Sequence, residues 1–162
     1  MAIIKTNIYA PVDGLTVAAA YSEIEEKGKS TTAALSDNKE EMVAFATYAI
    51  GSVTLGYGQS YESLGNRSSG VGTVEAYENT MWGVSFSVND NLTISYGEFE
   101  SEKDMNASAS VNVTMETEGL GISYNLGGAT VKLHTGEVKN ANYDSASGNT
   151  DEVTAIELSL AF

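Results

Sequence analysis

Apolar and polar residues alternate with a period of two along most of this chain. In residues 92–97 the apolar side chains Leu92, Ile94 and Tyr96 share one parity, while a threonine, a serine and a glycine share the other. The same alternation runs through residues 53–58 and 82–88. Successive side chains of a β-strand point to opposite faces of a sheet, so the pattern predicts strands with one apolar and one polar face. We therefore expect an all-β fold.

An aromatic residue, a tight turn and a threonine-containing strand recur four times. The aromatic residues lie 38 or 39 positions apart, at Tyr9, Tyr48, Phe86 and Tyr124. The turn sequences PVDG, IGS, VNDN and LGG carry the glycine, asparagine and aspartate that tight hairpin turns require. The repeating unit is therefore predicted to be a β-hairpin with a period of about 38 residues.

Long polar stretches separate the hairpins, at about residues 25–40, 63–76, 102–114 and 139–151. The last segment, VTAIELSLAF, alternates cleanly and adds a final strand. Residues 1–162 are thus predicted to form one unit, an antiparallel up-and-down meander of about nine strands. In such a meander all short turns lie at one end of the sheet and all long connections at the other.

The chain is strongly acidic. Its 22 Asp and Glu residues outweigh 8 Lys and Arg residues, which gives a formal net charge of −14. A negative surface without a basic stripe repels phosphate backbones, so we expect no nucleic-acid binding. Of the 22 acidic residues, 19 lie in or beside the long connections, so the two ends of the sheet differ chemically.

Seven of these carboxylates form a candidate acidic mouth at the loop end. They are Glu23, Glu25, Glu26, Glu98, Glu100, Glu102 and Asp104. Carboxylates around a pore entrance concentrate cations and repel anions within about a Debye length, which predicts a weak cation preference. Their spacing lacks the D-x-[DN]-x-[DN]-G arrangement of a calcium loop, so we expect a solvated acidic surface and no metal site.

Alternation alone does not decide which face of the sheet is enclosed. The polar face consists mainly of Thr, Ser, Gly and Ala, whereas soluble sheets usually expose Lys, Glu and Arg. This composition favours an enclosed aqueous or protein-lined interior, and the four aromatic residues at the turn end resemble the girdles of membrane barrels. The alternative is a soluble acidic β-barrel with the same residues in its core and an apolar ligand inside.

Membrane-spanning helices are not expected, because no apolar run approaches the about 20 residues that a spanning helix needs; residues 15–21, for example, are seven residues that include Thr16. The first residues lack the basic and apolar regions of a signal peptide, which fits a cytoplasmic, mature or partial chain.

Catalytic chemistry has few candidate residues. Cysteine is absent, His134 is the only histidine, and neither a Ser/His/Asp arrangement nor a phosphate-binding loop is present, so we expect no enzymatic activity and no cofactor. His134 and Lys132 alternate with apolar neighbours, which puts both on the polar face of the eighth strand. Glu157 falls on the polar face of the last strand, within reach of Lys132 across the ladder. These three residues are the candidate pore lining.

The last strand carries a further signal. Ile156, Leu158 and Leu160 share one face, and the chain ends on Phe162. This segment resembles the C-terminal strand of Gram-negative outer-membrane barrels, in which a final phenylalanine acts as the insertion signal. Together with four hairpins and one-sided long connections, it makes the chain resemble the C-terminal half of a general bacterial porin.

The resemblance implies a transmembrane β-barrel of about sixteen strands, of which this chain supplies about nine. Bacterial single-chain barrels have even strand numbers, so an odd number predicts further strands upstream. The family resemblance also implies passive diffusion of ions and small hydrophilic solutes across the outer membrane, a homotrimer, and contact with the lipid bilayer and lipopolysaccharide. A small outer-membrane barrel that serves as an adhesion or interaction scaffold remains an alternative.

Overall fold

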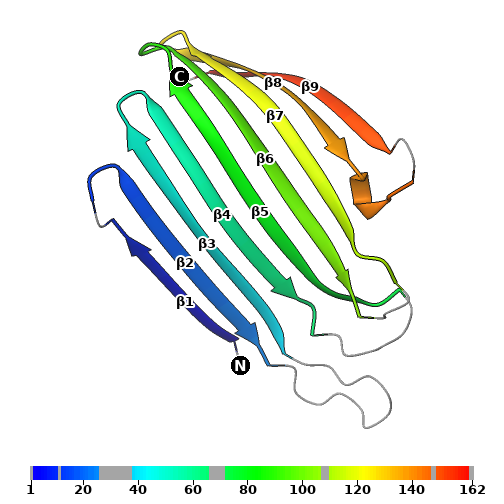
Figure 1. Ribbon diagram of the computed structural model, residues 1–162. Helices are drawn as coiled ribbons and strands as arrows, with labels where there is room; N and C mark the ends of the chain where they lie inside the picture. Colours follow the sequence, from blue (N-terminus) through cyan, green and yellow to red (C-terminus); the bar gives the residue numbers. More distant parts are fainter. Residues whose placement is uncertain are drawn as a thin grey trace, which may run out of the picture.

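The computed structural model describes residues 2–10, 12–25, 38–65, 72–106, 110–146 and 149–160. They form one nine-stranded antiparallel sheet in which each strand pairs with its neighbours in sequence (Figure 1). The strands are β1 (Ala2–Tyr9), β2 (Leu15–Ile24), β3 (Lys39–Ile50), β4 (Val53–Ser63), β5 (Val74–Ser87), β6 (Leu92–Met105), β7 (Val113–Asn125), β8 (Ala129–Lys139) and β9 (Thr150–Leu160). The predicted all-β meander is confirmed.

The four short turns have the local chemistry that their sequences predict. Gly14, Gly51 and Gly127 have φ values of 77°, 58° and 88°, a region that glycine enters without steric cost. The turn between β5 and β6 uses Asn89 instead, whose side-chain oxygen accepts hydrogen bonds from the backbone N–H groups of Asn91 and Leu92. These turns lie at one end of the sheet, and the long connections lie at the other (Figure 1).

The strands extend further into the polar stretches than the sequence pattern suggested. β6 continues to Met105, so Glu98, Glu100, Glu102 and Asp104 lie within a strand and not in a loop. The connection that follows β8 contains a short 3-10 turn, η1 (Ala141–Tyr143).

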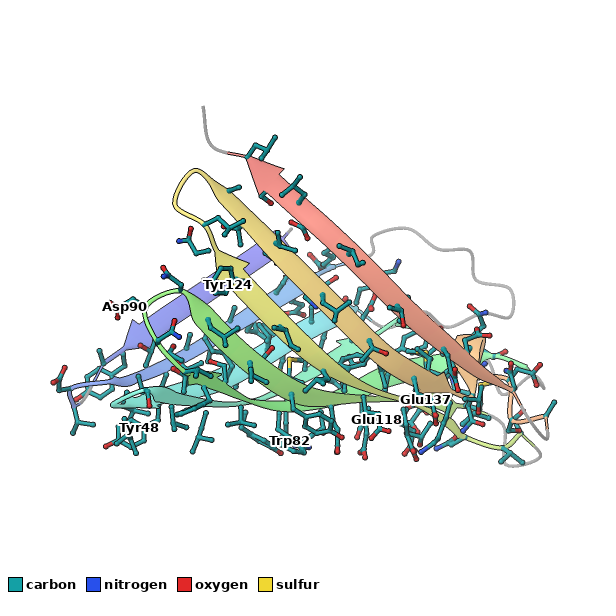
Figure 2. All side chains as sticks on the ribbon, turned by 90° about the horizontal axis from the view of Figure 1, so that it is seen from above. Tyr48, Trp82, Asp90, Glu118, Tyr124 and Glu137 are labelled. Atoms are coloured by element: carbon teal, nitrogen blue, oxygen red, sulfur yellow. The ribbon has the colours of Figure 1, made fainter. Side chains whose placement is uncertain are left out.

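The sheet is curved, and its two faces have different side chains. Figure 2 shows Tyr48, Trp82 and Glu118 on the convex side. Cross-strand partners share a face, and Trp82 pairs with Tyr57 on β4 and with Glu98 on β6. Most apolar and aromatic positions of the strands are therefore convex, and most of the Thr, Ser and Gly positions between them are concave.

Five glycines lie side by side across the concave face. The register aligns Gly56, Gly83, Gly97, Gly119 and Gly136 on five successive strands, and we call this set the glycine row. A Cβ at Gly97 would lie 3.0 Å from the carbonyl oxygen of Trp82, and one at Gly136 would lie 2.5 Å from that of Glu118. The backbones approach too closely there for a side chain, and such glycines let a sheet bend toward this face.

Candidate functional site

The candidate site is the concave wall of the sheet. On the turn side of the glycine row it carries serine, threonine, histidine and lysine side chains, among them Ser85, Ser95 and His134. On the loop side the next row contains the larger side chains Phe45, Met81 and Phe99. From the turn end to the loop end, the wall thus presents first hydroxyl and charged groups, then the glycine row, and then a short apolar row.

Lys132 and Glu157 are direct cross-strand partners on this wall. The Lys132 Nζ lies 3.1 Å from the Glu157 Oε1, which confirms the predicted ion pair. The same oxygen accepts a hydrogen bond from the Ser159 hydroxyl at 3.0 Å. His134 lies one row closer to the loops on β8, opposite Ala155. All three pore-lining candidates therefore share the concave face.

The predicted girdle residues lie on the convex face near the turns. The exposed fractions of these residues in the sheet are 68% for Tyr9, 40% for Tyr48, 45% for Phe86 and 42% for Tyr124. Aromatic rings of this kind at the rim of an apolar surface are typical of a membrane interface. The insertion-signal candidate Phe162 lies outside the described residues.

A second set of aromatic residues lies on the convex face of β5 and β6, closer to the long connections. The Trp82 Nε1 donates a hydrogen bond to Glu98 at 2.9 Å. The Tyr96 hydroxyl lies 2.8 Å from both Glu98 and Glu118. Each ring thus lies on the convex face and binds a neighbouring carboxylate with its polar tip, which is the usual behaviour of Trp and Tyr at a membrane interface.

A row of carboxylates begins beside Trp82 and runs across β6 to β9. Glu98, Glu118, Glu137 and Glu152 are successive cross-strand partners on β6 to β9, and we call them the acidic row. Figure 2 shows Glu118 and Glu137 on the convex side. Like charges placed directly opposite one another repel, so the row costs stability, which its hydrogen bonds to Trp82 and Tyr96 partly offset.

The acidic-mouth candidates therefore lie mainly on the outside of the loop end. Glu23, Glu98, Glu100, Glu102 and Asp104 all occupy convex positions. Glu25 directly follows β2, and Glu26 lies outside the described residues. The sequence alone predicted a ring of carboxylates around a pore entrance. Because the strands extend further than predicted, these carboxylates form an outer acidic surface instead of a ring.

Asp104 lies at the loop end of β6, above the aromatic residues. Burial raises the pKa of its carboxyl, and the neighbouring carboxylates of Glu102 and Glu78 raise it further. Its side chain accepts a hydrogen bond from Asn112 in the following connection. Among the described residues, no three Asp, Glu or His side chains converge into a set that could hold a metal ion.

One feature of the concave wall escaped the sequence reasoning. The connection between β8 and β9 folds back over the sheet, and the Tyr143 hydroxyl lies 2.7 Å from that of Ser101 on β6. A signal was available, because Tyr143 is the only aromatic residue in the four long polar stretches. An isolated tyrosine among Asn, Ser and Gly residues indicates that the segment packs against another part of the protein.

The convex face also carries a shallow groove of about 670 Å³ over β2 to β5. It is lined by the small residues Ala19 and Ala44 and by the larger residues Tyr21, Met42 and Tyr61, among others. Among the described residues, no helix is long and apolar enough to cross a membrane.

No protein-family model matches the chain, and no curated protein matches it. Among the solved structures, 15 chains are similar. One is a porin, described as "structure of porin refined at 1.8 angstroms resolution", which aligns with a TM-score of 0.66 at 17% sequence identity. The nine strands have the fold of a porin. The alignment covers 98% of this chain and 50% of the porin chain, so the chain spans about half the length of the porin that it matches.

The porin fold gives the concave wall its context. In a porin-like barrel the convex side of the sheet faces outward and the concave side faces the lumen. The resemblance predicted from the hairpin repeat is thus confirmed at the level of the fold.

Proposed function

We propose that this chain forms part of the wall of a water-filled channel in the outer membrane of a Gram-negative bacterium. The observation that carries the proposal is the division of side chains between the two faces of the sheet. The convex face is mostly apolar with aromatic residues at both margins, and the concave face is mostly small and polar apart from the row of Phe45, Met81 and Phe99. A barrel surrounded by lipid and filled with water needs this arrangement, whereas a soluble barrel with an apolar ligand needs the reverse.

The channel acts by passive diffusion of ions and small hydrophilic solutes, without catalysis or a cofactor. Lys132, His134 and Glu157 line the lumen and contribute charge to it. The acidic surplus at the loop end gives a weak preference for cations, because carboxylates on the outer surface of the rim still lower the potential at the entrance.

The wall is completed by further strands, since nine strands of this size leave both sheet edges open and an exposed edge pairs readily with another strand. By analogy with porins, the complete barrel has about sixteen strands and assembles as a homotrimer. The small residues Ala19 and Ala44 in the convex groove would let another subunit approach closely, and the remaining convex surface contacts lipid and lipopolysaccharide.

The first test is extraction of the native protein in detergent, followed by gel electrophoresis with and without boiling. We expect a detergent-dependent band that runs well above the 17.1 kDa of the chain in the unboiled sample and changes mobility after boiling. A monomer that stays soluble without detergent would overturn the membrane assignment.

The second test is reconstitution into planar bilayers under a salt gradient. We expect stepwise conductance and a reversal potential of the sign that indicates cation preference. Channels that favour chloride would refute the cation preference while leaving the channel function in place.

A further inference from the structure

We propose that the connection between β8 and β9 is a constriction element of this channel, folded onto the concave wall and fastened there by Tyr143. Its consequence for permeation rests on the proposed channel function, but its geometry rests only on contacts within the chain. The element consists of residues 140–146 and Asn149, which follow the end of β8 and precede β9.

Tyr143 lies between β8 and β9, yet it contacts β6 and β5, neither of which pairs with β8 or β9. Its hydroxyl lies 2.7 Å from the Ser101 hydroxyl on β6, and Ser101 is only 2% exposed. Its ring lies 5.4 Å from the ring of Tyr77 on β5, with the planes tilted by 44°. The Lys103 Nζ lies 5.0 Å above the same ring, close enough for a cation–π contact. A polar, an aromatic and a cationic contact thus hold one side chain.

These contacts place the element on the concave face. Tyr77, Ser101 and Lys103 have the parity of the glycine row and not of Trp82. Of the nine tyrosines in the chain, seven occupy convex positions, and the two that do not are Tyr77 and Tyr143, which pack on each other. The pair is therefore a separate feature from the membrane-facing aromatic residues.

The backbone of the connection is ordered by side chains of its own. The Asn140 Nδ2 donates to the carbonyl oxygen of Thr114 on β7, at a level where β8 has ended and offers no strand partner. The Asn149 Nδ2 donates to the carbonyl oxygens of Ala141 and Asp144, and its own carbonyl oxygen accepts from the Asn140 N–H. These bonds close the connection into a compact unit.

The backbone conformation indicates that the contacts hold the unit in place. Asn140, Asn142 and Tyr143 have φ values of 51°, 57° and 58°. Asparagine tolerates this left-handed region, but for tyrosine it is unfavourable and persists only where the surroundings impose it. The contacts of the ring and the hydroxyl supply that constraint.

The position of the element makes it a constriction. Strands are about 4.8 Å apart, so a segment that starts at β8 and reaches β6 and β5 covers about two to three strand widths of the inner wall. In a barrel the covered area is lumen, and the open cross-section at the loop end shrinks accordingly.

The test uses the absence of cysteine from the chain. A Ser101→Cys variant carries a single thiol beneath Tyr143, and its rate of reaction with a small charged methanethiosulfonate reagent reports whether the element covers it. The reaction is compared in native protein with Tyr143 present and with Tyr143→Asn, which keeps a residue that tolerates the left-handed backbone. Tyr143→Phe, which removes only the hydroxyl, is measured with Ser101 intact, because the introduced thiol already replaces the hydroxyl that Tyr143 contacts. Ser145→Ala, an exposed change in the same connection, is the matched control. The same substitutions without the cysteine are measured as single channels in planar bilayers.

We expect Tyr143→Asn to speed labelling of the introduced thiol by at least about tenfold, because a covered thiol reacts only when the cover opens. It should also raise single-channel conductance by roughly half, since the loop-end cross-section widens. Tyr143→Phe with Ser101 intact should raise conductance by less, and Ser145→Ala should change neither labelling nor conductance.

Three results separate the ways in which the inference can fail. If the introduced thiol reacts equally fast with Tyr143 present, the element does not cover the wall and the inference is overturned. If Tyr143→Asn uncovers the thiol but leaves conductance and solute size limit unchanged, the fold-back stands and the constriction is overturned. If no variant forms channels, the proposed function fails, and the labelling rates alone still decide whether Tyr143 fastens the connection.

Discussion

The two faces of this sheet are built on the same strands and differ in almost every other respect. The convex face carries seven tyrosines, the tryptophan and the acidic row, while the concave face carries the glycine row and short hydroxyl side chains. Curvature explains much of the contrast, because side chains spread apart on a convex surface and converge on a concave one. Size is therefore selected by curvature, and polarity by what each face contacts.

The largest expected effect comes from a charge placed on the convex face. Ala46→Arg introduces a guanidinium between Val17 and Tyr57, where an arginine facing lipid costs about 2–4 kcal/mol. Thr47→Arg, one residue along, points into the concave side opposite Gly56 and should cost far less. Urea unfolding of both variants in lipid vesicles measures the difference. Equal destabilisation would remove the distinction between a lipid face and a water face.

The concave face should be sensitive to size where the convex face is not. Gly136→Ala puts a Cβ 2.5 Å from the Glu118 carbonyl oxygen, and the strain should lower the free energy of unfolding by about 1–3 kcal/mol. Gly128→Ala, in a turn with nothing within 4 Å of the added Cβ, is the matched control and should change it by less than about 0.5 kcal/mol. If both variants unfold like the wild type, the glycine row is not a packing requirement.

The acidic loop end should respond to pH through Asp104. Because burial and neighbouring carboxylates raise its pKa in the folded state, the folded protein holds its proton more tightly than the unfolded chain. Stability from this group is therefore gained as pH falls through the raised pKa and lost as pH rises through it. Asp104→Asn should be more stable than the wild type near pH 7, and the gap should narrow toward about pH 4. Asp90→Asn, at the turn end, is the control, and an equal response would exclude the proposed cause.

The smallest effect is expected for the ion pair on the concave wall. Lys132 and Glu157 are 38% and 53% exposed, so their pairing should contribute no more than about 1 kcal/mol. A double-mutant cycle of Lys132→Met and Glu157→Gln at low and high salt measures the coupling. The same variants should shift ion selectivity more clearly than stability, and a coupling well above this range would indicate a drier wall than the proposed channel has.

Much of the fold was predictable, because the pattern of alternation determines which residues of a hairpin share a face. The nine strands, the four turns and the shared polar face of Lys132 and Glu157 all follow from it. The alignment between hairpins was not predictable, since a connection of ten or more polar residues leaves the register free. The glycine row and the acidic row both depend on that register. Tyr143 was missed for another reason: its contacts lie with strands more than 35 residues away in sequence, as the separation of 42 from Ser101 illustrates.

The glycine row has a consequence for any molecule that passes along the concave wall. Each of its five glycines has a ladder partner on both neighbouring strands, which engages its backbone amide and carbonyl, and none of the five carries a side chain. A permeating solute therefore meets a strip that offers neither charge nor free hydrogen-bonding groups. In the proposed channel this strip would not discriminate between solutes. Discrimination would come from the residues on either side of it, which are Lys132 with Glu157 toward the short turns and Tyr143 with Lys103 toward the long connections.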